Sequence, residues 1–229
     1  MFSNRNFLRV TAVAAALLFG QVLAGPSLGL PANLITDDPS PEDFPLVQNG
    51  VAAPLLLDAK DHAGVLRAAA DLQADIARVT GRTPELLTEI PATGATVVIA
   101  GTLGHNALID GMVRSGKIQV DGITGKWESF LIATVANPMP GVNRALVIAG
   151  SDKRGTIYGL YEISEQIGVS PWHWWADVPV KRSESLAIRA GTTVQGPPAV
   201  KYRGIFVNDE EPALGPWARK KFGGVNSKM

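Results

Sequence analysis

Short apolar runs alternate with longer helical patterns between residues 54 and 167 of this 229-residue chain. Compact apolar or β-branched runs, typical of strands, occupy residues 54–57, 96–100, 128–135 and 144–149. Residues 62–80 and 156–167 instead repeat apolar side chains every three or four positions, which indicates helices, and residues 106–115 predict a shorter helix. Strands and helices in this order pack as a sheet covered by helical layers. The pattern therefore predicts an α/β layer domain with a mixed sheet over residues 55–195.

The longest predicted helix, residues 62–80, has recognisable signals at both ends. Asp61 stands at its start, where a carboxylate can accept hydrogen bonds from the unpaired amides of the first turn. Gly81 stands at its end, where glycine readily adopts the left-handed conformation that terminates helices. We therefore expect these two residues to cap the helix.

The first 24 residues carry the pattern of a secretory signal peptide. Arg5 and Arg9 precede an almost purely apolar run, residues 10–24, and cleavage is expected before Gly25. The run is shorter than the roughly 20 residues that a membrane-spanning helix needs, so we expect a secreted, extracellular protein without a membrane partner after cleavage. Residues 25–54 contain six prolines and three glycines, which predicts a leader or linker with little regular structure.

The composition excludes several classes of function. Twenty-one basic residues balance twenty-one acidic ones, whereas nucleic-acid-binding proteins usually carry a basic excess. Cysteine is absent, which excludes disulfides, thiolate metal sites and a cysteine nucleophile. The three histidines, His62, His105 and His173, lie far apart in the sequence and none has the spacing of a metal site. We therefore expect no nucleic-acid partner, no metal and no cofactor.

Two segments in the second half of the chain carry residue types that bind ligands. Residues 150–156 follow a predicted strand and open a predicted helix, where phosphates commonly bind, but they lack the lysine of a P-loop, so a structural turn is favoured. Residues 170–179 (SPWHWWADVP) place three of the five tryptophans within four positions. Indole faces suit the C–H faces of sugar rings, but such a cluster can equally pack as a hydrophobic plug between domains. The residues alone leave both interpretations open.

A strand pattern near the C-terminus ends in a group of polar residues. The run Arg203–Val207 is largely apolar and leads into Asn208, Asp209, Glu210 and Glu211. In a (β/α)8 barrel the carboxyl ends of the strands build the active site; a solvated acidic loop is the plain alternative. Because an unpartnered strand leaves its backbone groups unpaired, the segment either caps the preceding domain or belongs to a truncated chain. We expect truncation.

Residues 150–179 and 200–226 together resemble glycoside hydrolase family 115, the xylan α-1,2-glucuronidases. Both runs are long and contain tryptophans, which are rare residues. The resemblance implies that residues 55–195 are the small N-terminal α/β domain of this family. It also implies that residues 196–229 begin the catalytic (β/α)8 barrel, which would be incomplete here because family members are far longer.

The resemblance implies a reaction as well. Family members remove (4-O-methyl)-glucuronic acid from xylan with inversion, using a carboxylic acid and a carboxylate about 6.5–9.5 Å apart. We expect that acid and base downstream of Met229, and we expect glucuronoxylan or its oligosaccharides as the partner.

Within this chain, the resemblance assigns substrate binding to the polar end of the last predicted strand. Asp209 is the foremost expected residue, with Asn208 and Glu210 beside it, and Trp174 is expected to contribute from the tryptophan cluster. Glu211 and Trp217 rank lower. The alternative is a stand-alone carbohydrate-binding or scaffold module that uses residues 172–175, although such a module has no use for an unpaired strand ending in acidic residues.

Overall fold

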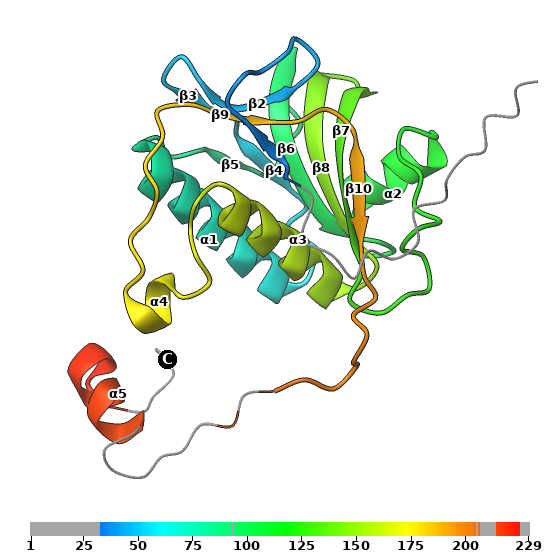
Figure 1. Cartoon of the computed structure of the whole chain (residues 1–229). Helices are drawn as coiled ribbons and strands as arrows, with labels where there is room; N and C mark the ends of the chain where they lie inside the picture. The colour runs from blue at the N-terminus through cyan, green and yellow to red at the C-terminus, as the bar shows by residue number, and fades with distance from the viewer. Residues whose placement is uncertain (1–32, 93, 205, 207–213, 225–229) are drawn as a thin grey trace, which may run out of the picture. The chain divides into compact units, whose positions relative to one another are not determined.

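The computed structural model describes residues 33–92, 94–204, 206 and 214–224, all within one compact unit, residues 32–229. Its centre is a six-stranded sheet in the order β10-β7-β8-β6-β4-β5 (Figure 1). The strands are β4 (Leu55–Leu57), β5 (Leu86–Leu87), β6 (Ala95–Thr102), β7 (Phe130–Met139), β8 (Val142–Gly150) and β10 (Thr192–Gln195). Neighbours from β8 to β5 pair in parallel, whereas β7 pairs antiparallel with both β8 and β10. The predicted mixed-sheet α/β architecture is therefore confirmed.

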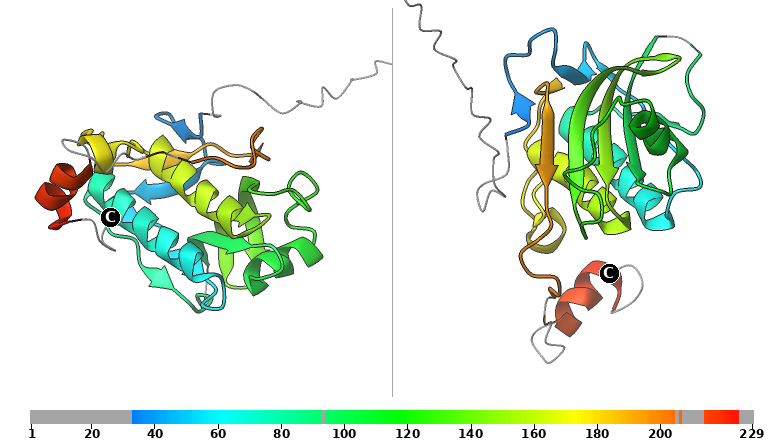
Figure 2. Two further views of the ribbon diagram at one scale, coloured as in Figure 1. Left: turned by 90° about the horizontal axis from the view of Figure 1, so that it is seen from below. Right: turned by 90° about the vertical axis from the view of Figure 1, so that its right-hand side faces the viewer.

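Helices cover both faces of this sheet. Helices α1 (Ala63–Thr80) and α3 (Lys153–Gln166) lie side by side on one face, and α2 (Ala107–Arg114) covers the other (Figure 2). Because successive side chains of a strand point to opposite faces, Leu146 and Ile148 of β8 join the core beneath α1 and α3, while Val147 joins the core beneath α2. All three side chains are fully buried. This burial explains why the second part of β8, residues 145–150, is apolar without alternating polar residues.

A second, smaller sheet includes part of the segment that we expected to be a leader. Its strands are β1 (Ile35–Thr36), β2 (Phe44–Gln48), β3 (Val51–Ala52) and β9 (Leu186–Ile188), in the order β1-β9-β2-β3. The expectation of little regular structure over residues 25–54 is therefore wrong for the described part of that segment, residues 33–54. Phe44 and Leu46 are fully buried, and β2 pairs not only with the adjacent β3 but also with β9, which lies far along the sequence. The prolines of residues 25–54 are visible in the sequence, but local composition gives no information about a pairing strand so far away.

The two ends of α1 differ in how well the sequence predicts them. Gly81 adopts the left-handed conformation (φ 72°) and ends the helix, as predicted. Asp61 does not cap it: the N-cap residue is His62, and no side chain caps the first turn. The buried Asp61 carboxylate accepts a hydrogen bond from the amide of the N-cap residue His62 at 2.7 Å. It also accepts hydrogen bonds from the Thr102 amide and the Asn106 side chain, both at 2.9 Å. Asp61 thus joins the start of α1 to the end of β6 and the start of α2.

Other element boundaries differ from the predictions by a few residues. Strand β7 continues to Met139 and β8 begins at Val142, so the hairpin turn is tighter than the one predicted over residues 137–143. Helix α3 begins at Lys153, three residues before its predicted start. The sequence did not predict β9, β10 or the single turn of helix α4 (His173–Ala176), because elements of three or four residues carry almost no periodic signal.

The predicted first strand of a barrel is not confirmed. Residues 201–204 and Phe206 are described and do not form a strand, and the rest of the predicted strand lies outside the described residues. The next described element is α5 (Leu214–Phe222). Among the helices of the described residues, none is long and apolar enough to cross a membrane.

The glycine-containing segment 150–156 is a structural turn that starts α3, in agreement with the favoured interpretation. The Asp152 carboxylate accepts hydrogen bonds from the Gly155 amide at 2.8 Å and from the Glu128 amide at 2.9 Å. A carboxylate of the chain itself therefore occupies this helix N-terminus. A Cβ atom at Gly155 would lie 2.1 Å from the Ser129 carbonyl oxygen, so the glycine permits close packing between helix and strand.

Two helical glycines test this packing role. We expect Gly155→Ala to lower the free energy of unfolding by about 1–3 kcal/mol, because the new methyl group overlaps a backbone carbonyl. Gly111 on α2 has room, with the nearest heavy atom 3.9 Å from an ideal Cβ, so Gly111→Ala should raise that free energy by about 0.5–1 kcal/mol through helix propensity. Urea denaturation followed by circular dichroism measures both changes. A Gly155→Ala variant as stable as the wild type would contradict the packing role.

Candidate functional site

The predicted site residues fall into two groups. Asn208, Asp209, Glu210 and Glu211 lie outside the described residues, so the structure does not test their placement. Trp174, which we expected to bind substrate, and Trp217, a weaker candidate, are described and lie on α4 and α5. These two helices are brought together by ring and charge contacts between their residues.

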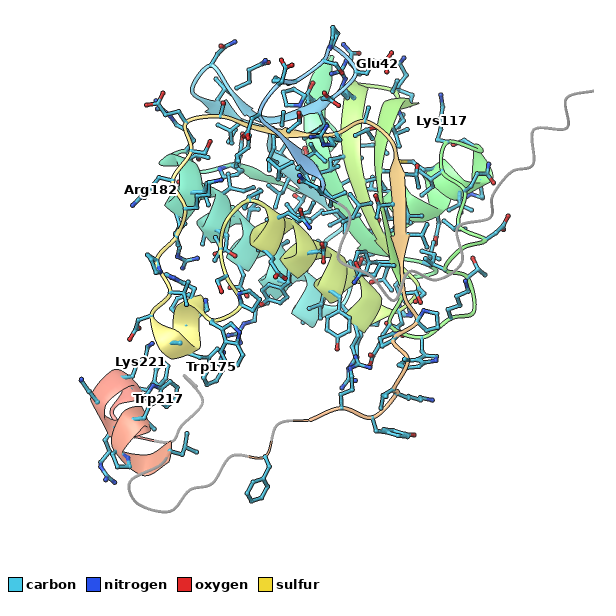
Figure 3. All side chains as sticks on the ribbon, in the orientation of Figure 1. Glu42, Lys117, Trp175, Arg182, Trp217 and Lys221 are labelled. Atoms are coloured by element: carbon cyan, nitrogen blue, oxygen red, sulfur yellow. The ribbon has the colours of Figure 1, made fainter. Side chains whose placement is uncertain are left out.

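Four tryptophans from α4 and α5 and their flanks form what we call the tryptophan surface: Trp172, Trp174, Trp175 and Trp217. The first three are 61%, 53% and 52% exposed. The Trp175 and Trp217 rings stack with their centroids 5.4 Å apart and an interplanar angle of 17°. Figure 3 shows Trp175, Trp217 and Lys221 gathered at this point. The short helix α4 therefore displays its indoles at the surface and does not bury them in the core.

Trp174 is held from two sides. The Arg78 guanidinium of α1 lies 4.9 Å from the centre of the Trp174 ring, a favourable cation–π arrangement, and Arg78 also forms an ion pair with Asp75. The His173 ring meets Trp174 edge-on with centroids 5.3 Å apart. A ring nitrogen of His173 lies 3.0 Å from the Val178 carbonyl oxygen, so the histidine is itself fixed.

Lys221 connects α5 to the end of α4. Its ammonium group lies 3.0 Å from the Asp177 carboxylate and also donates a hydrogen bond to the Trp174 carbonyl oxygen. The hydrogen bond and positive charge of Lys221 lower the pKa of Asp177. Asp177 adopts a left-handed conformation (φ 55°) that ends α4. A ring stack, an ion pair and a hydrogen bond therefore join the two helices.

A second group of interacting residues is centred on the buried Glu128. Its carboxylate forms ion pairs with Arg154 of α3, at 2.7 Å, and with Arg203. Arg203 also donates a hydrogen bond to the Tyr158 hydroxyl at 3.3 Å and lies 6.0 Å from the centre of the Trp127 ring. The two guanidinium groups lower the pKa of Glu128, and Glu128 in turn raises the pKa of both arginines.

Sequence reasoning missed the group around Glu128. Glu128 and Arg203 are 75 positions apart, and neither stands in a motif that would pair them. Glu128 has a left-handed backbone (φ 49°), uncommon for a residue other than glycine, but dihedral angles are not visible in a sequence. The pairing fixes the point at which the chain leaves β10 and continues toward α5.

Comparisons with known proteins find similarity to one family of glycosidases. The model of glycosyl hydrolase family 115 matches residues 195–229. A solved structure of a family GH115 4-O-methyl-α-glucuronidase, BtGH115A, with specificity for decorated arabinogalactans, is 32% identical to this chain, with a TM-score of 0.65 over 81% of it. Both comparisons show that the chain resembles glycosyl hydrolase family 115. It spans 22% of the length of that solved relative. No curated protein matches it.

The family match and the two groups of contacts coincide in the sequence. Arg203 and α5 lie within residues 195–229, the part that the family model matches. Arg203 forms an ion pair with Glu128. Helix α5 contacts Trp175 and Asp177, which lie on and at the end of α4. Among the described residues, the tryptophan surface and the Glu128 group are therefore two places where the α/β layers contact the segment most typical of the family.

The Glu128 ion pairs predict a pH-dependent contribution to stability. Since the folded-state pKa of Glu128 is lowered from its ordinary value of 4.5, the contribution is present above that value and is lost as the pH falls through the lowered pKa. We expect Glu128→Gln to have a lower melting temperature than the wild type near neutral pH. The difference should shrink below pH 4.5 and vanish in stronger acid.

Differential scanning calorimetry across that pH range measures the difference. The matched control is Glu42→Gln, which removes an exposed carboxylate before β2 (Figure 3) and should leave the melting temperature unchanged. A constant difference between Glu128→Gln and wild type at every pH would show that the ion pairs do not stabilise the fold through charge.

Proposed function

We propose that this chain is part of a secreted glycoside hydrolase that removes (4-O-methyl)-glucuronic acid from a polysaccharide with inversion at the anomeric carbon. Its similarity to the solved 4-O-methyl-α-glucuronidase is the observation that carries this proposal. The resemblance to glycosyl hydrolase family 115 supports a glycosidase, while the sugar removed and the inversion are part of the proposal. The signal-peptide pattern of residues 1–24 supports secretion.

The polysaccharide backbone is the least constrained part of the proposed substrate. The sequence resemblance implied xylan, whereas the solved relative has specificity for decorated arabinogalactans. We propose that the glucuronic acid side chain is the group recognised, because its carboxylate distinguishes it from the neutral sugars of either backbone and can form charge-assisted hydrogen bonds. Glucuronoxylan and glucuronidated arabinogalactan are therefore the two substrates to compare.

The general acid and base are proposed to lie elsewhere in the protein. Inversion needs one protonated carboxyl group at the leaving oxygen and one carboxylate that activates water. Among the described residues the buried carboxylates are Asp61, Asp75 and Glu128. Asp61 accepts hydrogen bonds from the chain itself, and Asp75 and Glu128 form ion pairs with arginines. We therefore propose none of the three as the acid or base.

We expect Asp209→Ala to slow release of glucuronic acid by roughly ten- to a hundredfold. The proposed role of Asp209 is to accept hydrogen bonds from sugar hydroxyls that strengthen in the transition state, and a charge-assisted bond contributes about 1.5–3 kcal/mol. The variant is made in the longest protein that the reading frame containing this chain encodes, and kcat/KM is measured on both polysaccharides. Glu211→Ala is the control and should be close to wild type, as should the melting temperature of either variant. Normal turnover of Asp209→Ala would mean that this segment is a solvated acidic loop.

The 229-residue chain by itself is expected to release no uronic acid from either polysaccharide. An inverting mechanism needs two carboxyl groups held on opposite sides of the sugar ring, and the buried carboxylates of the described residues are all engaged. High-performance anion-exchange chromatography of the digest measures the product, with the longer protein as the positive control. Release by the purified chain would place the active site within these residues.

A stand-alone carbohydrate-binding module is the second candidate. The observation in its favour is the exposure of three indoles on and beside α4. A module of this kind would bind polysaccharide and hydrolyse nothing, even in the longest protein encoded. Activity of that protein therefore decides between the two candidates.

A further inference from the structure

We propose that Glu128 is a positioning residue for the glycosidase. Through its ion pair it fixes Arg203 against the α/β layers, and with Arg203 the start of the segment that reaches Asp209 six positions later. This inference rests on the proposed function, in which Asp209 binds the sugar. It adds a residue that acts on the reaction without touching the substrate.

The side chain of Arg203 is held by several groups at once. Its guanidinium pairs with the Glu128 carboxylate and donates hydrogen bonds to the Tyr158 hydroxyl, at 3.3 Å, and to the Val200 carbonyl oxygen. The guanidinium carbon also lies 6.0 Å from the centre of the Trp127 ring. Because the donors of a guanidinium lie in one rigid plane, these contacts fix the orientation of the group as well as its place.

Glu128 is itself held by the α/β layers. Its amide donates a hydrogen bond to the Asp152 carboxylate at 2.9 Å. One carboxylate oxygen, Oε1, pairs with Arg154 of α3, while Oε2 pairs with Arg203. The Glu128 side chain is only 6% exposed, and close packing restricts a buried side chain to few rotamers. The carboxylate therefore presents Oε2 to Arg203 in a fixed direction.

The segment that follows β10 meets Glu128 twice. A Cβ atom at Gly196 would lie 3.0 Å from the Glu128 carbonyl oxygen and 2.7 Å from the Ser129 hydroxyl oxygen, so the backbone passes close to both residues. Seven positions later Arg203 binds the Glu128 carboxylate. Residues 196–203 therefore leave Glu128 and return to it, and they belong to the part that the family model matches.

Stability explains this arrangement only in part. The Arg154 and Arg203 side chains are 62% and 38% exposed, and ion pairs that involve exposed groups contribute modestly to folding. Removing a carboxylate from water has a cost that opposes this contribution. Ion pairs of this kind can, however, select one conformation of a chain over others. Selection of one path for the chain at Arg203 is what a positioning role requires.

Turnover by the longer protein tests this role. Glu128→Gln and Arg203→Gln should each lower kcat on glucuronoxylan by roughly threefold to thirtyfold. KM should change little, because a displaced group weakens transition-state contacts more than ground-state contacts. The double variant should be no slower than the slower single variant, since both substitutions remove the same ion pair. Rates are measured well below the melting temperature of every variant, so that unfolding does not contribute.

Arg154→Gln is the matched control. It removes the partner of the other Glu128 oxygen, but Arg154 lies on α3, outside the segment that the family model matches. We expect its kcat to equal that of the wild type, even if its melting temperature is lower. Equal losses of kcat in Arg154→Gln, Glu128→Gln and Arg203→Gln would indicate a general loosening of the fold and overturn the proposal.

Trypsin provides a readout that does not depend on activity. Cleavage after an arginine requires its side chain to enter the specificity pocket of the protease, which the ion pair with Glu128 opposes. In the 229-residue chain, Glu128→Gln should therefore speed cleavage after Arg203 several-fold. Cleavage after Lys117, an exposed base that follows α2, should not change (Figure 3). Mass spectrometry of the early fragments measures both rates, and an unchanged rate after Arg203 would show that the ion pair does not fix this residue.

The outcomes separate this inference from the proposed function. If the longer protein releases glucuronic acid and both Glu128→Gln and Arg203→Gln turn over like the wild type, the inference is wrong and the proposed function stands. If the wild-type longer protein releases none, the proposed function fails and the positioning role fails with it, whereas the trypsin rates still show whether Glu128 holds Arg203.

Discussion

The described structure depends on the side-by-side pairing of β6, β8 and β7. These long strands form the centre of the six-stranded sheet, and their apolar side chains point alternately into the cores on its two faces. A strand that is apolar on both faces is stable only when both faces are covered. The helices α1 and α3 on one side and α2 on the other therefore follow from the composition of these strands as much as from their own patterns.

Local pattern was enough to predict the centre of this fold. Residues 145–149 are apolar throughout and residues 62–80 repeat at helical spacing. The strand and the helix were both predicted because the signal lies within each segment. The small sheet was missed because Phe44 finds its partner in β9, which no local rule connects to it. Asp61 was assigned a capping role because it precedes a helix. Its carboxylate bonds to the N-cap amide of His62, but it also bonds to Thr102 at the end of β6 and to Asn106 at the start of α2.

The site was predictable to a smaller extent. The tryptophans of residues 172–175 were recognised from their spacing, but the contact of Trp175 with Trp217 could not be, since it depends on how residues 42 positions apart meet. The ion pair between Glu128 and Arg203 is of the same kind. In both cases one partner belongs to the α/β layers and the other to the segment that the family model matches. Among the described residues, the family-typical segment therefore has one ionic and one mainly aromatic attachment point, besides the pairing of Gln195 with β7.

The distribution of tryptophan has a consequence for spectroscopy. No tryptophan is among the buried residues of either core; four of the five form the tryptophan surface, and the fifth, Trp127, lies beneath Arg203. Intrinsic fluorescence therefore reports on the two attachment points, whereas far-ultraviolet circular dichroism reports on the sheet and its helices. Whether the two signals change together on heating measures how tightly the attached segment and the α/β layers form one cooperative unit.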